Sequence, residues 1–343
     1  MSSDVLRVAS IGIGRWSDVL GNALKRSNKI KMVSCYTRDE EKRKAFAAKY
    51  QITAHESYEA LLADPEIDAV LVTTPNFAHA DTIEQAAAAG KHVWTEKPIA
   101  HTMEHGHRIG EAVKKAGVTF SVGHSARMLG ASRMMRKLVE TGDVGQISLV
   151  EGNYSNERGL ELTPDKWRYY AANTPGGPLI QLLVHHFDTM QYVLGNIREV
   201  QAYRKRLYST GEVDDVAALV CEFENGALGY FGASWSAPGA YTINMYGTKA
   251  NLYHELDFNF WTAADVDDHC TLYRVAHKSS VKEAVAIPHT DMFREELEDF
   301  ADAVREGRDP EIGFDAGIRA LAVVHAAIKS ANERRPVAVS ELL

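Results

Sequence analysis

The sequence predicts two domains of different fold class: an α/β domain at residues 1–123 and an α+β domain with a large, mainly antiparallel open sheet at residues 124–343. Before Gly123, short apolar runs alternate with helical patterns, as in βαβ units that build a doubly wound parallel sheet. After Gly123 the rhythm changes to alternating segments around Asn225-Gly226, a hairpin signal because both residues tolerate positive φ angles. A chain of 343 residues is long enough for each domain to bury its own core.

The first domain is expected to contain at least five parallel strands with helices between them. The apolar runs that predict the strands are 5–11, 30–36, 69–73, 92–95 and 119–122. The helical patterns are 39–50, 78–89 and 103–115. Gly90 and Gly117 stand where the last two helices should end, and glycine is the usual residue after a helix.

The second domain is expected to begin with a helix at 131–140 and a strand at 146–154. Segments 217–222 and 228–234 alternate apolar and polar residues, which predicts strands with one face in the core. Two amphipathic helices should follow at 293–305 and 317–330, leaving one face of the sheet without an evident cover. We therefore expect a homo-oligomer, either a homodimer or a homotetramer.

Composition excludes several classes of function. The formal charge of −8 argues against a protein that binds nucleic acid by neutralising phosphates. No apolar run approaches the roughly 20 residues that cross a bilayer, and no basic segment opens the chain, so we expect no membrane partner and no secretion. Cys35, Cys221 and Cys270 lack the spacing of a disulfide framework, which fits a reducing cytoplasm.

A glycine-rich turn directly follows the first predicted strand. Gly12 and Gly14 precede Arg15 and Trp16, which open a helix, while Ser17 replaces the usual third glycine or alanine. The first glycine permits a tight turn, the second allows the backbone to approach a pyrophosphate, and the helix start donates N–H groups. A plain turn is the alternative, but the position after the first strand favours a Rossmann dinucleotide site.

The end of the second predicted strand bears on the choice between NADP and NAD. Sites specific for NAD place a carboxylate here for the ribose hydroxyls, whereas this chain has Tyr36-Thr37-Arg38. Arg38 can pair with a 2′-phosphate and stack on adenine. The sequence therefore favours NADP, with NAD as the alternative, and adds Thr37 and Arg38 to the candidate cofactor-binding residues.

Further motifs are similar to the glucose-fructose oxidoreductase / inositol dehydrogenase / MocA (Gfo/Idh/MocA) family over nearly the whole chain. The residues that carry this resemblance are Thr73-Thr74-Pro75-Asn76, His79, Ala89-Gly90-Lys91-His92-Val93, Glu96-Lys97-Pro98, Val122-Gly123, Arg127, Gly142–Ile147, Trp167-Arg168, Gly176-Gly177, His185-x-x-Asp188, Gly195, Phe223-Glu224-Asn225-Gly226 and Tyr246-Gly247-Thr248. The resemblance implies an N-terminal Rossmann domain and NAD(P)-dependent dehydrogenase or reductase activity. It also implies that Thr74, Pro75, Asn76, His79, Glu96, Lys97 and Arg127 contact the cofactor.

In that family the lysine of Glu-Lys-Pro lies beside the nicotinamide, and a later helix supplies an aspartate and a histidine four residues apart. Lys97 follows the fourth of the predicted strands, at the sheet edge where open α/β sheets bind ligands, and can stabilise alkoxide charge. His185 matches the family histidine and suits proton exchange with a hydroxyl. Gln181 stands where the family usually has aspartate; it can orient a hydroxyl but cannot take its proton. We list Lys97, His185 and Gln181 as the catalytic candidates.

Gln181, His185 and Asp188 are expected on one face of a helix from about residue 179, with Asp188 orienting the histidine or only meeting local polarity. His186 points elsewhere and is expected to pack or to border the substrate. Asn156, Trp167 and Arg168 complete the candidate substrate residues, and Tyr154 is expected to pack. Adjacent histidines point apart on a helix and no third ligand cluster appears, so we expect no metal.

The resemblance implies hydride transfer between nicotinamide and a secondary alcohol or ketone of a cyclic polyol, sugar or sugar derivative. Relatives that oxidise dihydrodiols or aromatic catabolites offer an alternative, to which Gln181, Tyr169 and Tyr170 could contribute. A non-catalytic NADP-binding sensor and a nucleotide-independent scaffold are alternatives of another class. Retained Lys97 and His185 argue against the sensor, and absence of dinucleotide binding would favour the scaffold.

Overall fold

The computed structural model describes residues 5–343, which divide into two compact units. The first unit contains the chain up to Ser125 together with Met292–Ile318, and the second contains Ala126–Asp291 with Arg319–Leu343. The sequence placed a boundary at 123/124 and assigned everything after it to one domain. The segment Met292–Ile318 instead belongs to the first unit, a return of the chain that local periodicity does not reveal.

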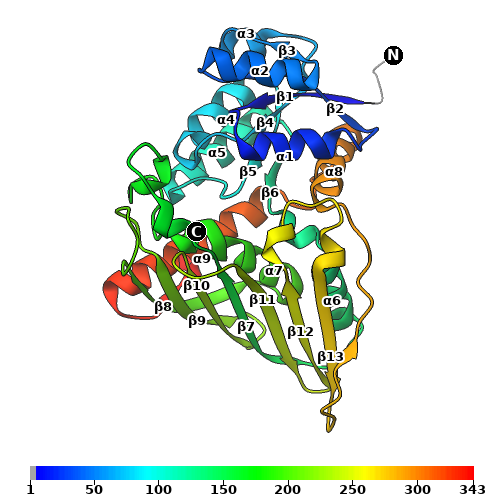
Figure 1. The fold of residues 1–343 in the computed structure, drawn as a ribbon, viewed down its shortest axis with the longest axis vertical. Helices are drawn as coiled ribbons and strands as arrows, with labels where there is room; N and C mark the ends of the chain where they lie inside the picture. Colours follow the sequence, from blue (N-terminus) through cyan, green and yellow to red (C-terminus); the bar gives the residue numbers. More distant parts are fainter. Residues whose placement is uncertain (1–4) are drawn as a thin grey trace. The chain divides into compact units, whose positions relative to one another are not determined.

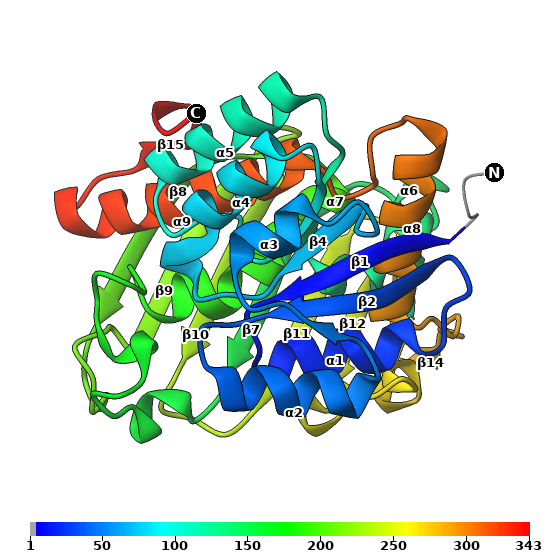
Figure 2. The ribbon, with the colours of Figure 1, turned by 90° about the horizontal axis from the view of Figure 1, so that it is seen from above.

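The first unit is built on a six-stranded parallel sheet with the order β3-β2-β1-β4-β5-β6. Its strands are β1 (Leu6–Ile11), β2 (Ile30–Tyr36), β3 (Thr53–Ala54), β4 (Ala69–Val72), β5 (His92–Glu96) and β6 (Phe120–Gly123). Its helices are α1 (Arg15–Leu24), α2 (Glu40–Tyr50), α3 (Tyr58–Ala63), α4 (His79–Ala88), α5 (Met103–Ala116) and α8 (Met292–Glu306). The predicted doubly wound fold is confirmed, and Figure 2 shows α1 and α2 on one side of β1 and β2, with α3 and α4 on the other.

Local sequence explains these elements. All four residues of β4, Ala69–Val72, are buried, as expected for a strand covered on both faces. Helix α5 begins where the Thr102 hydroxyl accepts the backbone N–H of His105, and it ends at Gly117, whose φ of 66° suits a residue without Cβ. The order of the strands reverses between β1 and β4, so the crevice for a ligand is expected outside their carboxyl ends.

The second unit contains a nine-stranded sheet in which only β7 and β10 pair in parallel. Its strands are β7 (Ile147–Ser155), β8 (Ile197–Lys205), β9 (Val216–Phe223), β10 (Leu228–Ser234), β11 (Ala240–Gly247), β12 (Ala250–Leu256), β13 (Cys270–Ala276), β14 (Glu283–Ala284) and β15 (Val337–Ala338). Its helices are α6 (Gly130–Glu140), α7 (Val184–Leu194) and the larger part of α9 (Phe314–Glu333). The prediction of a large, mainly antiparallel sheet is confirmed, and Figure 1 shows its long strands side by side.

The two faces of this sheet differ. Along β9 and β10, buried residues such as Leu219 and Phe231 alternate with exposed ones such as Val220 and Tyr230. Helix α7 packs on the buried face, where the rings of Phe187 and Phe231 are 5.9 Å apart. Over residues 5–343, none of the helices combines the length and the apolar character needed to span a bilayer.

Candidate functional site

The glycine turn after β1 requires glycine at its first position. Gly12 has a φ of 82°, and a Cβ there would lie 2.9 Å from the backbone nitrogen of Thr74, so both conformation and close packing exclude a side chain. Gly14 differs because a Cβ at this exposed position would meet nothing within 4 Å. The turn is therefore closed on its β4 side and open at Gly14, where the sequence predicts that a pyrophosphate approaches.

Ser17 closes the start of α1. Its buried hydroxyl accepts the backbone N–H of Gly14 at 2.8 Å and donates to the carbonyl of the same residue at 2.7 Å. The departure from a third glycine thus serves the turn itself. Arg15 is exposed, whereas Trp16 is half-buried with its ring 5.9 Å from that of Phe293 on α8. Trp16 therefore anchors the return segment, a role that local sequence could not show.

The end of β2 lies beside the glycine turn, because the Tyr36 carbonyl accepts the backbone N–H of Gly12 at 3.0 Å. The carbonyl of Thr37 accepts a hydrogen bond from Arg43 at 2.7 Å, which holds the loop. Arg38 is exposed, and Asp39 serves as the N-cap of α2, where the backbone N–H of Lys42 lowers the pKa of the Asp39 carboxyl. The acidic residue near this strand is thus engaged in capping the helix.

The loops after β4 and β5 are joined by His79. Its Nδ1 lies 3.0 Å from the Pro98 carbonyl and its Nε2 lies 3.0 Å from the Thr74 carbonyl. Its side chain is fully buried, which lowers the pKa of the imidazole and favours the neutral form. The sequence placed His79 among the cofactor contacts; the structure corrects this, because no part of the residue is exposed and the ring instead positions the two loops.

The remaining candidates of the first unit follow the same sheet edge. Thr74 and Pro75 are half-buried after β4 and Asn76 is 5% exposed. Glu96 is the buried last residue of β5, and half-buried Lys97 follows it, joined to Pro98 by a cis peptide. Since β2, β1, β4 and β5 are consecutive neighbours in a parallel sheet, their carboxyl ends bring the glycine turn, the Arg38 loop and Lys97 to one edge.

In the second unit, the segment before α7 differs from the predicted helix. Leu179–Leu183 forms a π-helical turn, and α-helical geometry begins only at Val184. The extra residue in this turn changes the angular relation between Gln181 and His185 from the expected i, i+4 face. Such π turns occur often at functional sites, but nothing in local periodicity distinguishes them from a regular helix.

His185 lies against aromatic rings of the second unit. It is 4% exposed, with ring centroids 5.6 Å from Tyr154 and 5.3 Å from Trp261. The expectation that Tyr154 packs is confirmed, since it is 3% exposed and contacts five rings. Sequence reasoning missed Trp261; the aromatic run Phe258-Asn259-Phe260-Trp261 was the available signal, but its partner is distant in sequence.

The side chain of Gln181 accepts a hydrogen bond from Arg168. Its Oε1 accepts a hydrogen bond of 3.1 Å from Nε of Arg168. The guanidinium carbon of Arg168 in turn lies 4.0 Å from the ring centroid of Trp167, which is a cation–π contact. Three predicted site residues thus form one cluster. Trp167 and Arg168 are adjacent in sequence, and Gln181 lies 13 positions after Arg168.

Asp188 forms an ion pair with Arg127. Nε and Nη2 of the guanidinium donate to the two carboxylate oxygens, and both side chains are almost completely buried. Arg127 also lies over the Tyr192 ring at 5.0 Å. The ion pair agrees with the second of the two alternatives for Asp188, that it meets local polarity, and the contact of Arg127 with a cofactor stays a prediction.

His186 packs in the interior of the second unit, which is the first of its two expected roles. It is fully buried, and its Nε2 lies 3.2 Å from the Asn153 carbonyl and 3.1 Å from that of Thr242. Burial lowers the pKa of His186 to about 4, so the ring is neutral at physiological pH. Helix α7 packs on the buried face of the sheet, and His186 faces that sheet because neighbouring helix positions point in different directions.

Asn156 is 6% exposed, and its Oδ1 accepts the backbone N–H of Arg158 at 3.1 Å. This bond stabilises the turn after β7, so the side chain has at least a structural role. Within the described part of the chain, no group of three His, Cys, Asp or Glu side chains could hold a metal ion.

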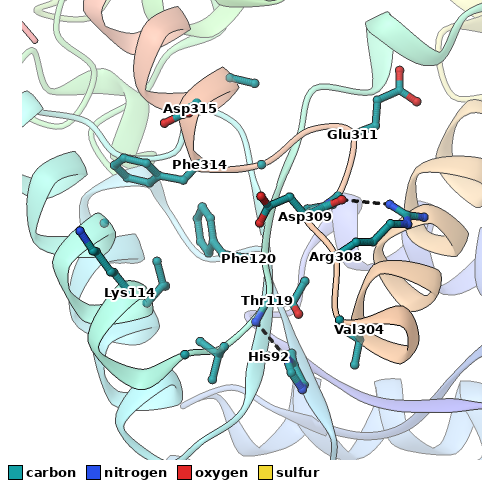
Figure 3. Close-up of a pocket in the computed structure, with 18 of the residues that line it drawn as sticks. His92, Lys114, Thr119, Phe120, Val304, Arg308, Asp309, Glu311, Phe314 and Asp315 are labelled. Carbon is teal, nitrogen blue, oxygen red and sulfur yellow. Dashed lines mark hydrogen bonds between the residues drawn. The ribbon is translucent and has the colours of Figure 1, made fainter.

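The first unit also contains a hollow, shown in Figure 3. It begins at His92 and Phe120, the first residues of β5 and β6, so it opens at the amino edge of the sheet. The ring of Phe120 lies 6.4 Å from that of Phe314 at its wall. None of the predicted site residues lines this hollow.

Comparisons with known proteins cover almost the whole chain. Residues 6–124 match an oxidoreductase family with an NAD-binding Rossmann fold, and residues 132–253 match the C-terminal domain described for GFO/IDH/MocA proteins. A crystal structure from Desulfitobacterium hafniense, provisionally named an NADPH-dependent oxidoreductase, is 43% identical, with a TM-score of 0.95 and 99% of both chains covered.

Two characterised relatives are more distant. Myo-inositol 2-dehydrogenase of Thermotoga maritima is 26% identical over 352 residues, which cover 98% of this chain and 100% of that protein. Levoglucosan dehydrogenase of Pseudarthrobacter phenanthrenivorans is 26% identical over 324 residues, which cover 83% of each chain.

Proposed function

Because the chain belongs to the Gfo/Idh/MocA family of NAD(P)-dependent oxidoreductases, we propose that it transfers hydride between NADP and a secondary alcohol or ketone of a cyclic polyol, sugar or sugar derivative. The observation that carries this proposal is the arrangement of the first unit, in which the glycine turn after β1 and Lys97 after β5 lie at the same carboxyl edge of the sheet, with only β4 between the two strands. Relatives that act on inositol and levoglucosan support the class of substrate.

The residues present fit a dinucleotide. Gly14 is exposed and has no neighbour within 4 Å of its missing Cβ, so backbone can approach a pyrophosphate there. Arg15 and the first N–H groups of α1 would hold the phosphates, and Thr74, Pro75, Asn76 and Glu96 would border the rest of the cofactor. NADP is favoured over NAD because Arg38 is exposed beside this turn.

When bound, the cofactor supplies the hydride acceptor or donor. In the oxidation direction, we assign His185 to accept the hydroxyl proton and Lys97 to stabilise the alkoxide oxygen. Gln181 cannot act as a base; its amide orients polar groups. His79 contributes indirectly, because it holds the loop that begins with Lys97-Pro98 against the loop that begins with Thr74.

The test begins with fluorescence titration of the purified protein by NADPH and NADH, followed by a turnover screen of polyols, sugars and dihydrodiols. Lys97→Met and His185→Ala should each reduce turnover by at least about 100-fold, a usual size for general acid–base catalysis. Lys114→Met and His277→Gln change exposed residues of the same two types and should retain activity. Near-full turnover by His185→Ala would refute its assigned role.

Other outcomes would favour the alternatives. Turnover only on dihydrodiols would favour the aromatic-catabolite dehydrogenase, for which the Tyr154 and Trp261 rings around His185 are the supporting observation. Binding of NADPH without turnover on any compound would favour a sensor. Failure to bind either dinucleotide would overturn the proposal.

We further propose that the protein is a homodimer or homotetramer, formed through the exposed face of the nine-stranded sheet. Four large apolar residues there are strongly exposed: Tyr203 at 71%, Val220 at 56%, Leu228 at 54% and Tyr230 at 43%. An exposed apolar sheet face of this kind is costly to leave in water, and a second copy of the same face can cover it through a twofold axis.

A further inference from the structure

We propose that Trp261 is a positioning residue for His185: its indole ring holds the imidazole in the orientation from which His185 exchanges a proton with the substrate. This inference rests on the proposed function, in which His185 is the acid/base, and it gives a role to a residue that the catalytic scheme does not use. It is carried by three aromatic rings that meet in the second unit.

The rings of His185, Tyr154 and Trp261 form a closed triangle. Their centroids are 5.6 Å apart for His185 and Tyr154, 5.3 Å apart for His185 and Trp261, and 5.7 Å apart for Tyr154 and Trp261. All three distances lie in the range of about 4.5–7 Å that is usual for aromatic contacts. His185 is on α7, Tyr154 is on β7 and Trp261 lies in the segment after β12, so three separate elements bring these rings together.

The backbone of α7 does not by itself fix the plane of the His185 ring. The torsion that turns an imidazole about its Cβ–Cγ bond has broad minima, so neighbouring groups decide the orientation of the ring. Trp261 meets His185 at an interplanar angle of 77°, which places the edge of one ring against the face of the other. Turning the imidazole plane would break this contact. A general acid/base needs its nitrogen aligned with the proton that it exchanges, so Trp261 acts on the reaction through His185.

Trp261 is suited to this role because it is itself held in place. Only 4% of the residue is exposed, so it offers almost no surface to a substrate. Its ring also contacts those of Tyr241 and Phe258, with centroids 5.4 and 6.4 Å away. The backbone N–H of Trp261 donates to the Phe258 carbonyl at 3.2 Å, which holds the turn that presents the indole. A support of this kind keeps a functional side chain in one geometry before the substrate arrives.

The first measurement follows the motion of the imidazole and does not depend on turnover. Nuclear magnetic relaxation of the NADPH-loaded protein, labelled with carbon-13 in its histidines, gives an order parameter for each Cε1–H bond. The signal of His185 is the one that His185→Gln removes. In the wild type this order parameter should be about 0.85, the value of a rigid group. Trp261→Met keeps apolar bulk but not the flat ring and should lower it below about 0.6, whereas Trp261→Phe should keep it near the wild-type value.

A second buried histidine serves as the internal control in the same spectra. The Nδ1 of His254 lies 2.9 Å from the Thr271 carbonyl, so a hydrogen bond to the backbone holds this ring. Its signal is the one that His254→Gln removes. The order parameter of His254 should be the same in the wild type and in Trp261→Met, which distinguishes a local effect on His185 from general loosening of the second unit.

Kinetics separate positioning from substrate binding. With the compound that the turnover screen identifies, Trp261→Met should lower kcat at least about tenfold, because a displacement of about 1 Å in a reacting group can cost about 100-fold. KM and the Kd for NADPH should stay within about twofold of the wild-type values, since Trp261 is assigned no contact with either ligand. Trp261→Phe should restore most of the activity.

Two milder variants test the same contact in case Trp261→Met does not fold. Phe258→Leu removes a ring that packs on Trp261 and on Tyr154, and it should lower kcat about threefold. Phe260→Leu changes the exposed phenylalanine two residues later, whose ring stacks on His269, and should leave kcat unchanged.

Three results would overturn the inference. They are a His185 order parameter that Trp261→Met does not lower, a kcat that Trp261→Met leaves unchanged, and a raised KM with unchanged kcat, which would make Trp261 a substrate contact. Each of them leaves the proposed function standing, because that function is tested by turnover of the wild type and by its loss in His185→Ala. If no compound is turned over, the proposed function fails, and the order parameter still decides whether Trp261 holds His185.

Discussion

Asp188 and Arg127 form a buried two-point ion pair, in which Nε and Nη2 of the arginine lie 3.0 and 2.5 Å from the two carboxylate oxygens. The pair links the start of the second unit to α7, the helix that carries His185. Asp188 is 1% exposed, so removing its partner would leave a charge without compensation in a medium that solvates it poorly.

We expect Arg127→Met to lower the free energy of unfolding by about 3–5 kcal/mol, the usual cost of breaking a buried ion pair. Urea denaturation at pH 7 measures this change. The double variant Arg127→Met/Asp188→Leu removes both charges and should recover most of the loss. If Arg127→Met alone were as stable as the wild type, the pair would have no structural role.

Two buried histidines, His186 on α7 and His254 on β12, predict that the folded protein loses stability in acid. Burial lowers the pKa of both His186 and His254 to about 4, below the usual value near 6.5. The unfolded state therefore binds more protons between about pH 6.5 and 4, so this contribution to stability is complete above pH 6.5 and is lost as the pH falls toward 4. Each histidine contributes about 3 kcal/mol across this window.

Urea midpoints measured from pH 7.5 to 4.5 should show this decline. His254→Gln should flatten it by about half, whereas the exposed control His277→Gln should leave the slope unchanged. A slope that His254→Gln does not alter would assign the acid sensitivity to other groups.

The two glycines of the turn should respond differently to alanine. Gly12→Ala forces a Cβ within 2.9 Å of the Thr74 nitrogen at a positive φ angle. We therefore expect this variant to lose about 1–3 kcal/mol of folding stability and also to lose cofactor binding. Gly14→Ala meets no protein atom and has an extended backbone, so it should weaken NADPH binding while the melting temperature is unchanged. Thermal melts and fluorescence titrations distinguish these effects.

Arg38 should decide between the two dinucleotides. Arg38→Ala is expected to weaken NADPH binding about 10- to 100-fold, since charge-assisted bonds to phosphate are among the strong ones, and to change NADH binding little. Lys42→Ala removes another exposed cation, four residues further along the chain on α2, and serves as the control. A wild-type protein that binds NADH more tightly than NADPH would contradict the assignment.

The exposed sheet face should control assembly. Tyr230→Glu places a charge among the apolar residues of this face, so we expect the oligomer to dissociate without loss of the fold. Light scattering after size exclusion measures the mass, and circular dichroism checks the fold. A monomeric wild-type protein would show that this face has another role.

Sequence reasoning predicted the parallel sheet, the glycine turn and the sheet-edge lysine, because these depend on local patterns that any βαβ unit must satisfy. The strands β4 and β5 and the turn at Gly12 were readable for this reason. The short β3, Thr53–Ala54, was not, since two residues carry no periodicity.

Only the tertiary structure decided which polar side chains meet. The bond from Arg168 to Gln181, the pair of Arg127 with Asp188 and the contact of Trp16 with Phe293 join residues whose separation in sequence ranges from 13 to 277 positions. The family resemblance placed His79 among the cofactor contacts, and His186 was expected either to pack or to border the substrate, because a sequence does not show which side chains are buried. The sequence by itself thus determined the helices and strands and the sheet edge where the chemistry is expected. Long-range packing decided which side chains contact each other, because such contacts depend on how elements that are distant in sequence fold together.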